Sequence, residues 1–219
     1  MPIVTAITAT PRHPGRFDIA VDGSSLATLS LDSIERLGLA VGVSTAGLED
    51  RIGREAVALR VYDRALDVLA FRSRASRELA RSLVQKGEPS DLVERAIARL
   101  TEQGLLDDSA FAESFTRARV LGAHQSKRRV QQELARKGVA RDVSDAAIAT
   151  VFREEAVDQR DVVERAARKK LTALRNLEPT VRRRRLYGFL ARRGYDGDDI
   201  RRAMEVVGEE LRADDVVEE

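Results

Sequence analysis

VQQELARKGVARDVSDAAIATV, residues 130–151, contains a basic amphipathic helix, a break at Lys137-Gly138 and a second amphipathic helix. Val130 and Leu134 lie four residues apart, so they stack on one face of the first helix. Gly138 follows directly, where a residue without Cβ most easily takes the left-handed C-cap conformation. A lysine before it suits the negative end of the helix dipole. The stretch therefore predicts two helices joined by a tight turn.

The same pattern occurs three times, with the breaking glycines at Gly87, Gly138 and Gly194. Apolar residues stand eight and four positions before each glycine, a basic residue one before, alanine nine after, and apolar residues ten and thirteen after. In that order the copies read Leu79, Leu83, Lys86, Ala96, Ile97, Leu100; Val130, Leu134, Lys137, Ala147, Ile148, Val151; and Leu186, Leu190, Arg193, Ala203, Met204, Val207. The agreement predicts a tandem array of helical modules. A repeat position is the sequence distance from the glycine, so that Val130 is at position −8 and Val151 at position +13.

The N-terminal stretch reads as strands. Ile3–Ala9 is one candidate, Phe17–Val21 alternates, and Asp22-Gly23 is a turn signal before Leu26–Leu31. The predicted fold is therefore mostly α, an elongated tandem array of three three-helix modules with a small N-terminal antiparallel β-rich piece. The predicted parts are residues 1–60, a β-meander with the start of a long helix; repeats 61–105, 106–156 and 157–211; and an acidic tail, 212–219.

Charge is abundant but unevenly distributed. Charged residues make up 34% of the chain, and aromatic residues only 4%. The net charge is +2, yet residues 160–202 hold 14 Lys or Arg and 6 Asp or Glu, a net of +8. Residues 205–219 hold 7 acidic residues and one Arg, a net of −6. This asymmetry predicts a polyanion-binding region followed by an acidic tail.

Several classes of protein are disfavoured by what the sequence lacks. It has no cysteine, no apolar run long enough to span a membrane and no signal-peptide pattern, so a cytoplasmic protein is expected. No phosphate-binding loop, dinucleotide motif or nucleophile elbow occurs, and His13 and His124 stand without a zinc-ligand set. We expect neither an enzyme nor a cofactor or metal site. Asp107-Asp108 could be a catalytic carboxylate pair, but helix capping is the favoured interpretation.

Each module carries basic residues ahead of its glycine, and these are the candidate binding residues. They are Arg72, Arg74 and Arg77; Lys127, Arg128 and Arg129; and Lys169, Lys170, Arg182, Arg183, Arg184, Arg185, Arg192 and Arg193. Solvated helix faces are the alternative interpretation. Recurrence at equivalent places favours a stripe that contacts a linear polyanion. Only Tyr187 and Tyr195 accompany the clusters as candidate stacking residues, so sequence-independent phosphate contact is favoured over base stacking.

At these residues the chain resembles the RecX regulators of the RecA recombinase. The resemblance rests on residues 74–79 (RASREL) with Leu83 and Lys86-Gly87; on residues 104–108 (GLLDD) with Phe111-Ala112; on residues 133–139 (ELARKGV); and on Leu186, Phe189-Leu190, residues 192–195 (RRGY) and Ile200. It covers about residues 60–208, and the N-terminal piece resembles the variable N-terminal region of the family. Ala75 departs from the pattern, since members often carry serine there.

This resemblance implies a protein that regulates RecA mainly negatively. It would bind along the groove of the RecA–single-stranded DNA filament, or contact double-stranded DNA, and suppress ATP hydrolysis, strand exchange and coprotease activity. A self-capping array is expected to be a monomer. Two alternatives remain open, namely a stand-alone sequence-independent nucleic-acid-binding protein and a helical scaffold that binds no DNA.

Overall fold

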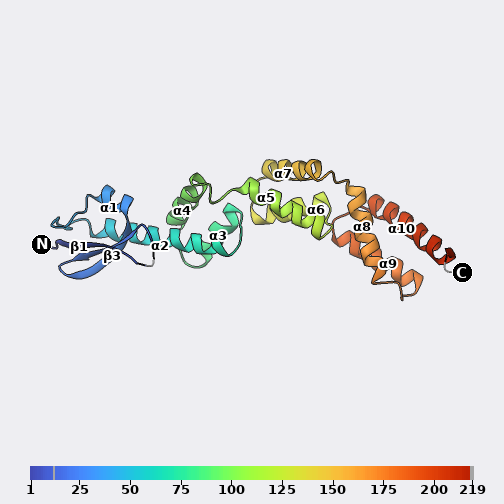
Figure 1. Cartoon of the computed structure of the whole chain (residues 1–219), viewed down its shortest axis with the longest axis horizontal. Coiled ribbons are helices and arrows are strands. Elements are labelled where there is room, and N and C mark those ends of the chain that lie inside the picture. The colour runs from blue at the N-terminus through green and yellow to red at the C-terminus, as the bar shows by residue number, and fades with distance from the viewer. Residues whose placement is uncertain (12, 218–219) are drawn as a thin grey trace. The chain divides into compact units, whose positions relative to one another are not determined.

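The computed structural model describes the backbone of residues 1–11 and 13–217 and the side chains of 1–11 and 13–208. Three strands and then helices follow one another along the chain (Figure 1). The strands are β1 (Val4–Ala9), β2 (Arg16–Val21) and β3 (Ser24–Ser30). The helices are α1 (Leu31–Leu37), α2 (Glu49–Phe71), α3 (Ser76–Gln85), α4 (Ser90–Glu102), α5 (Asp108–Arg117), the π-helical turn η1 (Ala118–Gly122), α6 (Lys127–Lys137), α7 (Arg141–Glu154), α8 (Gln159–Thr172), α9 (Pro179–Arg192) and α10 (Gly197–Val217). The mostly α fold with a small N-terminal sheet is confirmed.

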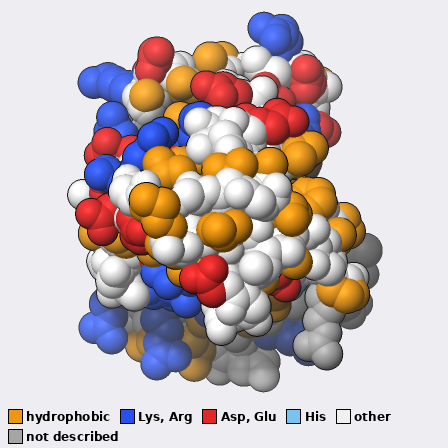
Figure 2. Space-filling view, turned by 90° about the vertical axis from the view of Figure 1, so that its left-hand side faces the viewer, with side chains coloured by type: hydrophobic (Ala, Val, Ile, Leu, Met, Phe, Trp, Pro, Cys, Tyr) orange, Lys and Arg blue, Asp and Glu red, His pale blue; other side chains and the backbone are white. Residues whose placement is uncertain are grey.

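The N-terminal strands form an antiparallel sheet in the order β1-β2-β3. Asp22 and Gly23 make the β2–β3 turn, both with positive φ, as that two-residue turn requires. Ile19 of β2 and Leu29 of β3 are buried against Ile34 of α1. Figure 2 views this end of the chain, where apolar side chains gather across the middle of the face and charged side chains lie mostly around them. The β-rich piece therefore presents a different surface chemistry from the basic helices.

The repeat glycines have the backbone that the sequence predicts. Gly87, Gly138 and Gly194 have φ values of +88°, +90° and +88°, which is the left-handed region. The apolar residues at positions −8, −4 and +13 and the alanines at +9 are buried in all three modules. Position +10 differs from the prediction, because Ile148 is buried whereas Ile97 and Met204 are only partly buried. The core of each module is therefore set by the repeat, with one position that varies.

The chain forms two compact units. The first contains Met1–Arg74 and Leu79–Leu106, and the second contains Ala75–Glu78 and the chain from Asp107 onward. In the first unit, Leu79 and Leu83 of α3 pack with residues of α2 and α4 around Leu100. In the second, α5 packs on α7 and α8 packs on α10. Helix α10 continues to Val217, beyond the end expected near residue 211, and the side chains of the predicted acidic tail lie outside the described residues.

Two junctions within the second unit repeat the same hydrogen bond. Asp108, the first residue of α5, accepts a hydrogen bond from the backbone N–H of Ser76 at 2.7 Å. Gln159, the first residue of α8, accepts one from the N–H of Lys127 at 3.4 Å. Ser76 and Lys127 are both at repeat position −11 and both begin a helix. Each of these helices thus receives a cap from a residue of the following module.

A close backbone approach accompanies each of these caps. A Cβ placed on Gly138 would lie 2.5 Å from Cβ of Arg77, and one on Gly194 would lie 2.6 Å from Oγ of Ser126 and 2.7 Å from Cβ of Arg129. A Cβ on Gly87 would meet nothing within 4 Å. Glycine at the second and third repeats therefore serves packing as well as backbone conformation.

The aspartate pair at 107–108 has the capping role that the sequence favoured. Asp107 accepts hydrogen bonds from the N–H groups of Ser109 at 2.8 Å and Ala110 at 3.0 Å. Its neighbour Asp108 caps the first turn of α3, as described above. Both carboxylates are thus engaged with backbone donors of helix N-termini.

Removing the Asp108 cap is expected to destabilise the second unit. We expect Asp108→Ala to lower the free energy of unfolding by about 1 kcal/mol, because a helix N-terminal N–H loses its acceptor. Urea unfolding followed by circular dichroism measures this. Asp108→Asn keeps an acceptor oxygen and should lose clearly less; equal losses in the two variants would contradict the capping role.

Candidate nucleic-acid interface

Helix α9 is the most basic element of the second unit. It carries Arg182–Arg185 and Arg192 and no carboxylate. Glu178 caps its N-terminus by accepting from the N–H groups of Thr180 and Val181, and Pro179 occupies the first turn. The Thr180 hydroxyl also donates to this carboxylate, and that hydrogen bond, followed by the two backbone ones, holds the pKa of the Glu178 carboxyl below its usual value. The helix therefore starts with a fixed anionic cap and continues with a dense row of guanidinium groups.

A groove with four cations lies between α8 and α9. Its volume is about 430 Å³, and its lining residues are Lys170, Leu174, Arg184, Arg185, Gly188 and Arg192. Arg184, Gly188 and Arg192 are spaced by four and share one face of α9, while Lys170 of α8 and Leu174, in the turn after that helix, complete the lining. Gly188 leaves the floor open because it has no side chain. No acidic residue is among the described residues that line this groove, so it suits an anion such as a phosphate.

The charges of this groove are largely unneutralised. Within the described part of the chain, no carboxylate oxygen lies within 4 Å of Arg184, Arg185 or Arg192. Lys170 Nζ lies 5.4 Å from the ring centroid of Phe189, which positions the ammonium without cancelling its charge. We name this set, Lys170, Arg184, Arg185 and Arg192, the α8–α9 cation groove.

The arginine run at 182–185 is divided by the helix that carries it. Successive residues turn by roughly 100° around an α-helix, so four in a row cannot face one partner. Arg184 and Arg185 line the α8–α9 cation groove, whereas Arg182 and Arg183 line a second groove between α9 and α10. The sequence presents them as one cluster, but the structure gives them two different surroundings.

Arg193 is engaged inside the second unit. Its guanidinium lies 4.3 Å from the ring centroid of Phe189, and burial lowers its pKa below the ordinary value. Its backbone carbonyl accepts a hydrogen bond from Ser126 N–H at 3.1 Å. Tyr195 is 3% exposed and donates its hydroxyl to the carbonyl of His124 at 3.0 Å, and burial raises its pKa. Neither side chain is therefore exposed for contact with a partner.

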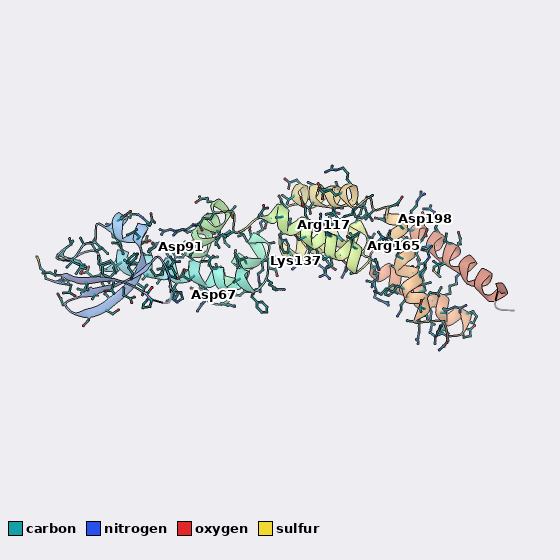
Figure 3. The ribbon with its side chains drawn as sticks, viewed as in Figure 1. Asp67, Asp91, Arg117, Lys137, Arg165 and Asp198 are labelled. Carbon is teal, nitrogen blue, oxygen red and sulfur yellow. The ribbon has the colours of Figure 1, made fainter. Side chains whose placement is uncertain are left out.

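His124 lies beside the positive charges of this module. Burial, and then the charges of Lys169 and Arg193, lower the pKa of His124 below 6.5, with Arg165 of α8 adding to the effect (Figure 3). Lys169 itself is exposed. The positive potential around the candidate binding residues of module three therefore reaches beyond the α8–α9 cation groove.

The His124 environment predicts a pH dependence. The unfolded imidazole takes up a proton near pH 6.5 and the folded one only at lower pH, so the unfolded state binds more protons in that window. We expect stability to fall as the pH drops below 6.5, and His124→Gln to remove that component. Urea unfolding at about pH 7.5 and about pH 5.5 measures it. If both proteins lose the same stability, His124 is not responsible.

The cations of module two are mostly paired. Glu133 lies 3.2 Å from Arg119 and 2.9 Å from Arg129, and Arg117 pairs with Glu154 and Glu155 (Figure 3). Lys127 Nζ lies 4.2 Å from the ring centroid of Phe152. Arg128 is exposed, with no carboxylate within 4 Å among the described residues. Of the candidates in this module, only Lys127 and Arg128 keep an uncompensated charge.

The module-one candidates are also engaged. Arg72 is exposed at the end of α2, Arg74 is half-buried, and the stem of Arg77 packs against Gly138. All three have interaction partners. The structure therefore brings together four of the predicted residues in one groove and distributes the others. It also adds Gly188, which the Arg184-Gly188-Arg192 spacing could have indicated.

Other kinds of site find no support in the described residues. No group of three or more His, Cys, Asp or Glu side chains there could hold a metal ion. No helix in the described part of the chain has the length and apolarity needed to cross a membrane.

Comparison with known proteins identifies three helical domains in tandem. Models of the first, second and third three-helix domains of RecX match residues 62–100, 107–148 and 158–204. Regulatory protein RecX of Mycolicibacterium vanbaalenii is 39% identical over 137 residues, covering 60% of this chain and 73% of that protein. Regulatory protein RecX of Mycobacterium marinum is 39% identical over 150 residues, covering 68% and 83%.

Solved structures share the fold. A crystal structure of regulatory protein RecX superposes with a TM-score of 0.74 at 21% identity, covering 95% of this chain and all of that one. RecX from Lactobacillus salivarius gives a TM-score of 0.56 at 18% identity, covering 69% of this chain and 97% of that one. With three family domains in order and relatives matched over more than two thirds of their length, the chain belongs to the RecX family.

Proposed function

We propose that this chain regulates the RecA recombinase, mainly negatively, by binding along the groove of the RecA–single-stranded DNA filament. It would suppress ATP hydrolysis, strand exchange and coprotease activity. We further propose that it acts in the cytoplasm as a monomer and has no catalytic activity of its own. Membership of a family whose relatives are named regulatory proteins supports the general role.

The α8–α9 cation groove is the observation that carries the DNA-binding part of the proposal. Four cations converge there with no carboxylate among the described lining residues, so a phosphate backbone would gain charge-assisted hydrogen bonds and release counterions. Tyr187 is 44% exposed and Tyr195 is buried, so the module offers few faces on which bases could stack. Contact with phosphates independent of sequence is therefore the favoured mode.

The decisive experiment follows ATP hydrolysis by the cognate RecA on single-stranded DNA as this protein is added. We expect inhibition at substoichiometric protein that persists when excess DNA is present. Inhibition that extra DNA relieves would instead indicate a stand-alone DNA-binding protein that sequesters the substrate. No effect would contradict regulation of the recombinase and favour a helical scaffold.

A further inference from the structure

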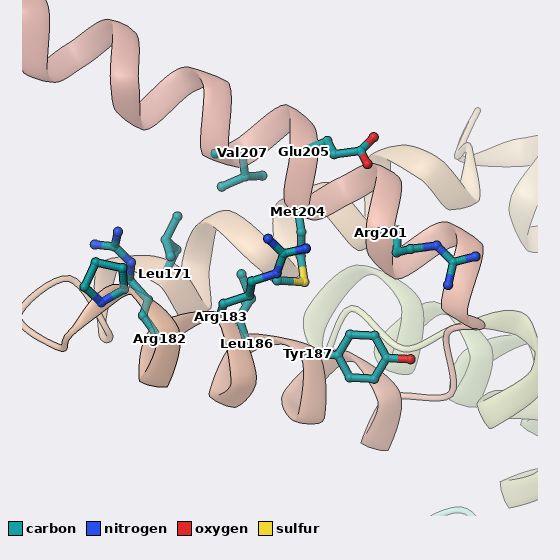
Figure 4. A pocket seen from close by; sticks show the side chains of 11 residues that line it. Leu171, Arg182, Arg183, Leu186, Tyr187, Arg201, Met204, Glu205 and Val207 are labelled. Carbon is teal, nitrogen blue, oxygen red and sulfur yellow. The ribbon is translucent and has the colours of Figure 1, made fainter.

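A second groove lies on the other side of α9, between α9 and α10 (Figure 4). Its volume is about 540 Å³, within the range of ligand-binding pockets. Leu171, Leu186 and Val207 form an apolar floor, Met204 is partly exposed, and Tyr187 stands at one end. In Figure 4, the ribbons of α9 and α10 diverge toward Arg182 and Val207.

The rim of this groove is mainly basic. Arg182, Arg183 and Arg201 line it together with one carboxylate, Glu205. Arg201 is paired with Asp198, whereas Arg183 has no carboxylate within 4 Å among the described residues. A partner for this groove must therefore offer both negative charge and an apolar group. A phosphate backbone supplies only the first.

Module two shows what fills the equivalent space. Repeat position +14 is Phe152 in module two and Gly208 in module three. Phe152 is 8% exposed and belongs to the core, and Lys127 covers its ring at 4.2 Å from the centroid. Lys127 is at position −11, which is Arg183 in module three. Module three thus keeps the covering cation but lacks the ring.

Among the described side chains, none occupies the place of that ring. A Cβ on Gly208 would meet nothing within 4 Å. The chain has no Phe, Tyr or Trp after Tyr195, so its own C-terminal segment cannot provide an aromatic side chain. Moreover, α10 forms one wall of the groove and continues as a helix to Val217, which carries residues 209–217 onward along its axis. A ring in this place would therefore come from another molecule.

We infer that the α9–α10 groove binds an acidic segment of a partner protein and receives one aromatic side chain of that segment. The ring would take the place that Phe152 has in module two, on the floor of Leu171, Leu186 and Val207. Arg183 would cover it as Lys127 covers Phe152, and the neighbouring carboxylates of the segment would pair with Arg182 and Arg183. This inference does not depend on the proposed action on RecA.

The test uses the full chain and two fluorescein-labelled peptides, Glu-Glu-Phe-Glu-Glu and Glu-Glu-Ala-Glu-Glu. Fluorescence anisotropy should show the phenylalanine peptide binding at least about tenfold more tightly than the alanine peptide, with titration to about 1 mM. Equal binding of the two peptides, or no binding of either, would overturn the inference.

Two variants identify the groove. Gly208→Phe fills it from within and should abolish binding of the phenylalanine peptide, while Gly208→Ala, the matched control, should retain binding. Arg183→Glu should weaken binding about tenfold or more. Circular dichroism checks that each variant is folded. If folded Gly208→Phe and Arg183→Glu both bind like the unmodified chain, the peptide occupies another surface.

Two competitors exclude other occupants. Oligothymidylate should not displace the phenylalanine peptide, because it binds the α8–α9 cation groove; displacement would make nucleic acid the occupant. A peptide of residues 209–219 should bind no better than the alanine peptide. Binding as tight as that of the phenylalanine peptide would overturn the requirement for a ring and point to the tail of a second copy.

Discussion

Gly194→Ala is expected to lower the free energy of unfolding of the second unit by about 2–5 kcal/mol. The left-handed backbone costs an alanine roughly 1–2 kcal/mol. The new Cβ would also lie 2.6 Å from Oγ of Ser126 and 2.7 Å from Cβ of Arg129, and such overpacking costs about 1–3 kcal/mol. Both atoms belong to the beginning of α6, so relief requires the two modules to shift.

Gly87→Ala is the matched control, because its φ of +88° is the same and its Cβ would meet nothing. It should cost only the backbone part, about 1–2 kcal/mol. Urea unfolding followed by circular dichroism measures both variants. Similar losses in the two would mean that the close approach at Gly194 adds nothing to the backbone effect.

Arg184→Glu/Arg185→Glu is expected to reduce the affinity for single-stranded DNA by about 100-fold, since each lost charged hydrogen bond is worth roughly 1.5 kcal/mol or more. The slope of log affinity against log salt should also fall by about 2, one for each phosphate contact removed. The double variant should inhibit RecA correspondingly less. Fluorescence anisotropy with oligothymidylate at several salt concentrations measures the affinity and the slope.

Arg182→Glu/Arg183→Glu makes the same change of charge two residues earlier on the same helix. These side chains line the α9–α10 groove, so this variant should lose only their weaker long-range attraction for the DNA phosphates. It should keep most of the slope of log affinity against log salt concentration. Circular dichroism should show both variants folded. Equal losses in affinity and slope would mean that the overall field of α9, rather than the α8–α9 cation groove, binds DNA.

The helices and cores of the modules could be predicted from local sequence because their cause is local. Periodicity of four places Leu134 and Leu190 in the core, and glycine marks each left-handed cap. The turn at Asp22-Gly23 was predictable for the same reason. The bond from Ser76 N–H to Asp108 was not, because it joins helices whose mutual placement depends on tertiary packing.

The candidate site was only partly predictable. Basic composition identified all four residues of the α8–α9 cation groove, and helical spacing could have separated Arg184 from Arg182. Composition does not reveal which cations are neutralised, however. Glu133 pairs with Arg129 across one turn and also with Arg119 of η1, and a π-helical turn is not evident from the sequence. Ion pairs between residues of different helices therefore determine which basic side chains keep an unneutralised charge and can contact a partner.

The repeated cap has a consequence for polymerisation. At the two junctions of the second unit, the helix that receives the cap begins at position −11, but α9 begins four residues earlier, where Glu178 accepts from the N–H groups of Thr180 and Val181 and Pro179 has no N–H to donate. Position −11 of module three, Arg183, therefore lies inside α9, and the cap that joins the earlier modules has no equivalent there. A second copy adding head to tail would lack this hydrogen bond, so the repeated cap does not extend the array beyond one chain.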